Sequence, residues 1–153
     1  MSHFRGKFDY TVDDKGRINI PAKFRKVLNP TAAETFVICR APENCLRAYP
    51  QDMWEKYEQE ISSRPETPET VRFQRLLYNT VTDSTLDAQG RITLSPLQIK
   101  TAAIAKNVTL IGMNGFVEIW DTATYNGLFG SDGDFDHVYY KSVETEMRKI
   151  APQ

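Results

Sequence analysis

Apolar and polar residues alternate on both sides of a short polar segment near the N-terminus. Phe8, Tyr10 and Val12 precede this segment, residues 13–17, and two isoleucines flank an asparagine across residues 18–20. A period of two is typical of a strand that buries one face. The pattern therefore predicts two strands joined by a tight turn.

The chain repeats this pattern further on. Residues 11–20 (TVDDKGRINI) return as residues 85–94 (TLDAQGRITL), an offset of 74, with five of the ten positions identical. An internal repeat is stronger evidence of architecture than any single local signal. We expect two related halves that share one core.

The polar segment predicts a specific turn. Residues 14–16 suit a three-residue loop, with Gly16 in the left-handed conformation that closes such hairpins. This loop places Asp13 opposite Arg17, where carboxylate and guanidinium can pair and hold the arginine upright at the tip. The second copy repeats the arrangement with Asp87, Gly90 and Arg91.

Periodicity and turn residues outline the remaining elements. Strands are predicted at residues 4–12, 35–39, 45–49, 80–86, 91–94, 108–111 and 116–120. Helices are predicted after Pro21, from about Gln51, at 68–77 with Thr67 as its cap, after Pro96, and at 137–149. Residues 62–68 break the helical pattern, and the chain is expected to loosen at 126–134.

Composition limits the class of protein. With 153 residues, 41% of them hydrophobic, the chain can bury one substantial core, and we expect one compact unit. No stretch resembles a signal peptide or a membrane span, so a cytoplasmic protein is expected. Residues 1–28 carry seven bases and three acids (7 − 3 = +4), whereas the remainder carries 12 bases and 17 acids, or −5. Any basic surface must therefore be local.

The sequence offers no catalytic constellation. It has two histidines, no phosphate-binding glycine loop and no serine in an elbow motif. Cys39 and Cys45 flank a predicted hairpin turn and are interpreted as buried or half-buried free thiols, not metal ligands. Asp13 and Asp87 each have an arginine four residues later, which keeps both carboxylates ionised and inert. We expect no enzyme, cofactor, metal or small-molecule substrate.

Recognition of nucleic acid fits the residues better. Lys15 at the hairpin tip and Arg17 beside it can reach a phosphate or the acceptor edge of guanine, where a guanidinium makes two parallel bonds. Ala88 and Gln89 replace Asp14 and Lys15 in the second copy, so the first copy is expected to be the stronger contact. Ordinary turn chemistry, preserved by gene duplication, is the alternative explanation of the repeat.

Several motifs together resemble the MraZ family of bacterial transcriptional regulators. They are FRG (4–6), DDKGR (13–17), IPAKFR (20–25), Leu46 with Tyr49, Pro50 and Trp54, DAQGR (87–91) and EIWD (118–121). The resemblance, which extends to about residue 125, implies an α+β, mainly β fold: tandem SpoVT/AbrB-type swapped-hairpin elements in one pseudo-dimeric β-barrel with flanking helices. The implied layout is repeat 1 at 7–54, a connecting helical segment at 55–82, repeat 2 at 83–126 and a C-terminal helical tail at 127–153.

The resemblance also implies a function. Family members form rings and bind direct repeats of double-stranded DNA in the promoter of their own division and cell-wall gene cluster, in the cytoplasm at the nucleoid. Carried over to this sequence, the DNA contacts are Asp13, Lys15, Gly16, Arg17, Asp87 and Arg91, with Arg5, Lys7 and Lys23 as candidate additional phosphate contacts. The basic run 24–26 becomes Gln98-Ile99-Lys100 in the second copy, which favours the first copy as the DNA contact. The alternative function is a ring-forming scaffold that touches DNA only incidentally.

Overall fold

The computed structural model describes residues 3–130 and 135–150, and its contacts divide the chain after Asp121 into two units. The first unit contains both copies of the repeat, but the expectation of one compact unit for the whole chain is wrong, because the residues from Thr122 onward form a second unit. Its strands are β1 (Phe4–Thr11), β2 (Arg17–Asn19), β3 (Thr35–Arg40), β4 (Leu46–Pro50), β5 (Thr82–Thr85), β6 (Arg91–Thr93), β7 (Asn107–Asn114) and β8 (Val117–Asp121). Its α-helices are α1 (Ala22–Lys26), α2 (Gln51–Ser63), α3 (Pro68–Tyr78) and α4 (Pro96–Thr101).

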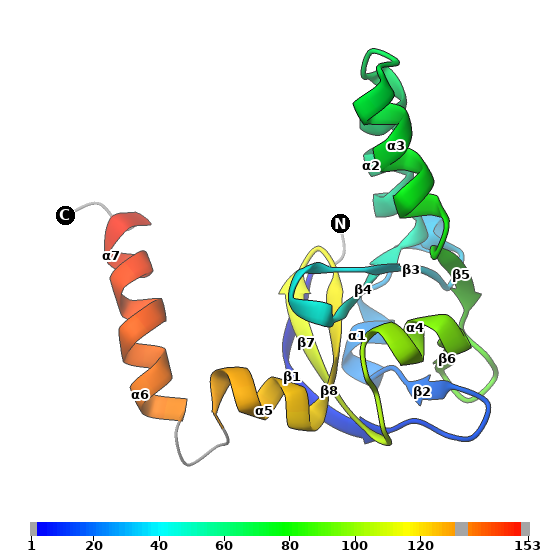
Figure 1. The fold of residues 1–153 in the computed structure, drawn as a ribbon. Helices are drawn as coiled ribbons and strands as arrows, with labels where there is room; N and C mark the ends of the chain where they lie inside the picture. Colours follow the sequence, from blue (N-terminus) through cyan, green and yellow to red (C-terminus); the bar gives the residue numbers. More distant parts are fainter. Residues whose placement is uncertain (1–2, 131–134, 151–153) are drawn as a thin grey trace. The chain divides into compact units, whose positions relative to one another are not determined.

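Six strands form one antiparallel sheet in the order β1-β7-β8-β4-β3-β5 (Figure 1). Strands β5, β7 and β8 of the second copy are equivalent to β1, β3 and β4 of the first copy. If each strand is exchanged for its equivalent, the order read from one edge is the same as the order read from the other edge. Strand β7 is longer than predicted because it pairs along the whole of β1, from Phe4 opposite Asn114 to Thr11 opposite Asn107. The mixed α+β, mainly antiparallel class is confirmed.

The swapped-hairpin β-barrel that the resemblance implies is not confirmed, because the sheet is not closed. The pairing of the two strands within each predicted hairpin is wrong. Strands β1 and β5 are the two edges of the sheet, so the sheet is open. Strand β1 pairs with β7, whereas β2 pairs with β6 in a separate two-stranded sheet. Because β2 and β6 use their hydrogen bonds on each other, neither strand extends the large sheet to close it.

Alternation along β3 explains why this strand is buried on both faces. Phe36 and Ile38 join the main core, which also contains Phe4 and Phe24 in edge-to-face contact, with ring centroids 5.3 Å apart. Val37 and Cys39, on the other face, pack with Tyr49 and Trp54 in a second cluster. Trp54 is 5% exposed, which confirms that α2 uses this residue for packing.

A buried glutamine connects α4 to the sheet. The Gln98 side chain is fully buried, and its amide nitrogen donates to the carbonyl oxygens of Ile38 (3.3 Å) and Thr80 (3.0 Å) and to Thr82 Oγ1 (3.0 Å). Its carbonyl oxygen accepts from the Ser95 N–H, and Ser95 Oγ accepts from the Gln98 N–H, so the pair caps α4. In the first copy Phe24 occupies the corresponding position.

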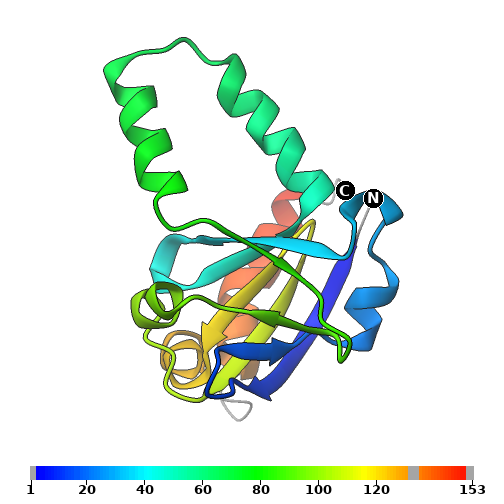
Figure 2. The ribbon, with the colours of Figure 1, turned by 90° about the vertical axis from the view of Figure 1, so that its right-hand side faces the viewer.

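Helices α2 and α3 extend away from the sheet and return to it as a helical arm (Figure 2). The predicted cap is confirmed, because Thr67 Oγ1 accepts from the Thr70 N–H at 3.2 Å as part of a capping box. Tyr78 Oη donates to Glu58 Oε2 at 2.6 Å and joins the two helices near the sheet. Several large apolar side chains of the arm are exposed, among them Leu76 at 66%.

The second unit is helical. It contains α5 (Thr122–Phe129), α6 (Phe135–Tyr139), a π-helical turn at Tyr140–Glu144 and α7 (Thr145–Ile150). Residues 126–129 are helical where the sequence predicted a loose segment, because the rings of Tyr125 and Phe129 pack at helical spacing with centroids 4.9 Å apart. The rest of that prediction, residues 131–134, lies outside the described residues. None of the described helices has the length and apolar character needed to cross a membrane.

Candidate nucleic-acid interface

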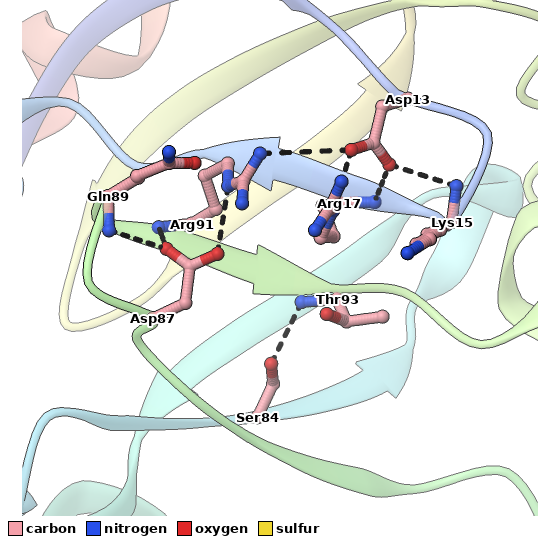
Figure 3. Close-up of polar contacts among 8 residues, drawn as sticks. All are labelled: Asp13, Lys15, Arg17, Ser84, Asp87, Gln89, Arg91 and Thr93. Carbon is pink, nitrogen blue, oxygen red and sulfur yellow. Dashed lines mark hydrogen bonds and ion pairs between the residues drawn. The ribbon is translucent and has the colours of Figure 1, made fainter.

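The first Asp-x-x-x-Arg segment is a tight turn organised around one carboxylate (Figure 3). Asp13 Oδ1 accepts from the backbone N–H groups of Lys15 (3.0 Å) and Arg17 (2.8 Å), and Oδ2 accepts from Arg17 Nε at 2.6 Å. The turn closes through the Gly16 N–H, which donates to the Asp13 carbonyl oxygen at 3.0 Å. The predicted opposition of Asp13 and Arg17 is confirmed.

The second segment has the same geometry. Asp87 Oδ1 accepts from the N–H groups of Gln89 and Arg91, each at 2.9 Å, and Oδ2 accepts from Arg91 Nε at 2.8 Å (Figure 3). In both turns the carboxylate binds Nε and not a terminal nitrogen of its own arginine. Each aspartate thereby fixes the direction of its arginine.

Each turn is bonded to the strand that follows the other turn. The Gly16 carbonyl oxygen accepts from the Leu94 N–H (2.8 Å), and the Gly90 carbonyl oxygen accepts from the Ile20 N–H (3.0 Å). Gly16 has φ +80°, and a Cβ on this residue would lie 2.5 Å from the Leu94 carbonyl oxygen. The close approach of the two backbones therefore requires glycine.

Strand β2 of the first copy pairs with β6 of the second copy, which we call strand exchange, and this pairing brings both arginines onto one surface. In the β2–β6 pair Ile18 lies opposite Ile92, and both isoleucines are buried in the core. Because side chains alternate along a strand, the opposite face of this two-stranded sheet carries Arg17, Asn19, Arg91 and Thr93. Arg91 Nη1 also lies 3.8 Å from Asp13 Oδ2, so the two pairs touch (Figure 3). We call this surface the β2–β6 ribbon face. It replaces the two separate hairpin tips that the sequence suggested.

Both aspartates are charged on this face. The backbone N–H of Arg17 makes the largest contribution to lowering the pKa of Asp13, and the Arg17 side chain and the Lys15 N–H lower it further, against a smaller opposing effect of desolvation. Arg91 and Gln89 lower the pKa of Asp87 in the same way. The side chains of Arg17 and Arg91 are 33% and 22% exposed, so both remain accessible from solvent.

The other predicted contacts are unevenly placed. Lys15 is exposed on the first turn, and Lys23 is exposed on α1. Arg5 and Lys7 are exposed on β1, but Arg5 lies opposite Met113, towards the end of the strand that is remote from the turn. At about 3.3 Å per residue, the six residues from Arg5 to Thr11 span about 20 Å, so the structure does not bring Arg5 to the turns.

Arg25 is a residue of this region that sequence reasoning assigned to the wrong turn. Its Nε donates to the Ile20 carbonyl oxygen at 3.1 Å, and its guanidinium lies against Gly90, where a Cβ would be 2.7 Å from Cζ. Ile99, its counterpart at the offset of 74, lies in the same way against Gly16. The first copy's basic helix therefore adjoins the second turn. The offset of 74 identifies Ile99 as the equivalent of Arg25 in the second copy. Only the strand exchange seen in the structure shows which turn each of the two residues supports.

Metal ligands and reactive thiols were the other chemistries considered for this chain. Among the described side chains, residues 3–130 and 137–150, no group of three histidine, cysteine, aspartate or glutamate residues could hold a metal ion. Cys39 and Cys45 are buried free thiols, as predicted, and burial raises their pKa to about 11 and about 12. Neither thiol is a reactive thiolate at neutral pH.

One protein-family model matches this chain twice. The model of the MraZ protein family, described as antitoxin-like, matches residues 3–76 and again residues 77–137. A protein of Polaromonas sp. (strain JS666 / ATCC BAA-500) named transcriptional regulator MraZ is 35% identical over 122 residues, which cover 80% of this chain and 84% of that protein. The family model thus matches both copies of the repeat, and this chain belongs to the MraZ family.

Proposed function

We propose that this chain is a sequence-specific DNA-binding transcriptional regulator and that its β2–β6 ribbon face is the surface that binds DNA. The observation that carries the proposal is the presence of two Asp–Arg pairs on one face of a two-stranded ribbon. A two-stranded ribbon fits the major groove of B-form DNA, which is about 12 Å wide. The curated relative named transcriptional regulator supports this reading.

Each arginine is prepared for two-pronged recognition. Asp13 and Asp87 hold the Nε atoms of their own arginines, which leaves the terminal nitrogens for the acceptor edge of guanine or a phosphate, although Arg91 Nη1 also lies 3.8 Å from Asp13 Oδ2. An arginine that is already held in place loses less conformational freedom on binding. This lowers the free-energy cost of binding by about 0.5 to 1.5 kcal/mol per side chain. Lys15, on the exposed turn, supplies a further phosphate contact. In this mechanism the aspartates orient the arginines and do not touch DNA.

We propose that the protein acts as an oligomeric ring on direct repeats in the promoter of its own division and cell-wall gene cluster, in the cytoplasm at the nucleoid. One ribbon on a chain of net charge −1 neutralises few phosphates and would bind weakly at cellular salt. Several ribbons bound to several repeats gain about 10² to 10⁴ in avidity without new contacts. The repeats at 7–54 and 83–126 each contribute one arginine to each ribbon, with 55–82 as a connecting segment and 127–153 as a tail.

The scaffold alternative is supported by one observation. Phe73 and Leu76 on α3 are 43% and 66% exposed, and Tyr57 on α2 is 49% exposed, which is typical of a surface that binds another protein. A scaffold would assemble through this arm without requiring the β2–β6 ribbon face. The two functions therefore differ in whether the ribbon arginines matter.

Binding to DNA across a salt series separates them. We expect wild type to prefer a tandem-repeat fragment from upstream of its own gene over scrambled DNA, and Arg17→Ala to lose that preference. Lys56→Ala, which removes an exposed positive charge from α2, is the control and should bind like wild type. Equal affinity of wild type for both DNAs, or full binding by Arg17→Ala, would refute the proposal. Light scattering on the same samples measures the molar mass and so tests whether the chains form an oligomeric ring.

A further inference from the structure

The structure points to a DNA phosphate contact at Arg25, and we infer that this residue of the first copy completes the cationic surface of the second turn. The inference rests on the proposed function, because it concerns the same DNA surface. It reverses the sequence expectation that the basic run 24–26 equips only the first turn.

The first step is position. The Arg25 guanidinium is fixed by the Nε bond to the Ile20 carbonyl oxygen and by contact with Gly90, so it lies directly beside the second turn. Arg25 lines a hollow of about 520 Å³ together with Asp87, Ala88 and Gly90 of that turn. The side chain is exposed, so a ligand can reach it from solvent.

The second step is charge. The segment 13–17 carries two acids and two bases (2 − 2 = 0), and the segment 87–91 carries one of each (1 − 1 = 0). Arg25 therefore gives the second turn a net charge of +1, whereas the first turn has the apolar Ile99 in the equivalent place. The second turn has Gln89 where the first turn has Lys15, and Arg25 from the first copy compensates for that missing positive charge.

The third step is availability. In the described part of the chain no carboxylate forms an ion pair with Arg25, although Glu34 and Asp87 line the same hollow. Asp87 is already bonded to Arg91 Nε at 2.8 Å. A ribbon in the major groove has phosphates along both walls of the groove, so a guanidinium beside the turn at the ribbon's end faces a phosphate. Arg25 therefore contacts the DNA backbone, while Arg17 and Arg91 face the bases.

The test uses Arg25→Ile, which copies the residue that packs under the first turn, and Arg25→Lys, which keeps the charge. Binding of the tandem-repeat DNA fragment is measured between about 50 and 200 mM salt, and thermal stability is measured on the same proteins. We expect Arg25→Ile to reduce the slope of log K against log salt by about 0.9 per engaged subunit. Arg25→Lys should retain the wild-type slope, and all three proteins should be folded.

The outcomes discriminate clearly. If both variants lose affinity and thermal stability with an unchanged slope, Arg25 only supports the turn, and the inference is wrong. A slope reduced equally by Lys56→Ala would also overturn it, because the effect would then be general charge loss. Failure of wild type to bind the DNA fragment would refute the proposed function, whereas normal wild-type binding with an unaltered Arg25→Ile slope would refute this inference alone.

Discussion

Replacing the two turn glycines with alanine tests the proposed role of strand exchange in holding the ribbon together. Both residues have positive φ, +80° at Gly16 and +75° at Gly90, where alanine costs about 1 to 2 kcal/mol. The substitutions differ in what the new Cβ meets. At Gly16 it meets the Leu94 backbone carbonyl oxygen at 2.5 Å, whereas at Gly90 it meets the end of the flexible Arg25 side chain.

The magnitudes follow from these neighbours. The Arg25 side chain can rotate away if it gives up its Nε bond to the Ile20 carbonyl oxygen, so Gly90→Ala should cost little beyond the backbone strain of about 1 to 2 kcal/mol. The Leu94 carbonyl oxygen belongs to the backbone just beyond β6, and it cannot move without disrupting the bond from the Leu94 N–H to the Gly16 oxygen, worth about 0.5 to 1.5 kcal/mol, and the packing of the buried Leu94 side chain. We therefore expect Gly16→Ala to lower the free energy of unfolding by about 2 to 4 kcal/mol.

Urea unfolding followed by far-ultraviolet circular dichroism measures both variants against wild type. The two proteins differ by one methyl group at equivalent positions, so each controls for the other. Equal loss of stability in both variants, or a larger loss for Gly90→Ala, would show that the contact between the first turn and Leu94 does not hold the ribbon together.

Three further outcomes are expected. Asp13→Asn should weaken DNA binding by about 3- to 10-fold, because the amide oxygen can keep the bonds to the Lys15 and Arg17 N–H groups only if the NH2 group, which cannot accept, faces the arginine Nε. Asp14→Asn, at an exposed neighbour with the same charge change, should not weaken it, and equal effects in a binding titration would exclude the orienting role. Gln98→Leu should lower the free energy of unfolding by about 2 to 4 kcal/mol, because the buried hydrogen bonds of the Gln98 amide are lost. Urea unfolding measures this loss, and an unchanged stability would show that these hydrogen bonds contribute nothing. Burial raises the pKa of Cys39 to about 11 and of Cys45 to about 12, so their contribution to stability is complete below the ordinary thiol pKa of 9.0 and is lost as pH rises towards those values. Mass spectrometry should detect alkylation of both thiols at pH 8 only in denaturant, and rapid alkylation of the native protein would contradict this burial.

The features predicted correctly from the sequence are those set by local chemistry. The Asp13–Arg17 turn, its repeat and the Thr67 cap each depend on residues within five positions of one another, so their spacing determines their geometry. The burial of Trp54 follows from helical periodicity in the same way.

The features that the sequence did not predict depend on non-local pairing. A period-two pattern identifies a strand and its buried face but not its partner, so the pairing of Ile18 with Ile92 could not be inferred. For the same reason the basic run 24–26 was assigned to the first turn alone. The barrel was implied by the family resemblance and not by this pattern, and the structure does not confirm it.

The palindromic strand order also determines how the protein can come apart. The pairs β1–β7, β8–β4, β3–β5 and β2–β6 each join a strand from one copy to a strand from the other. A cut in the segment between α2 and α3 would therefore release no independent half. The two fragments would complement each other like subunits of a dimer, and neither would have a complete core alone. The covalent link through the helical arm makes this association intramolecular, which fixes the pairing of unlike copies and allows the two turns to diverge in sequence.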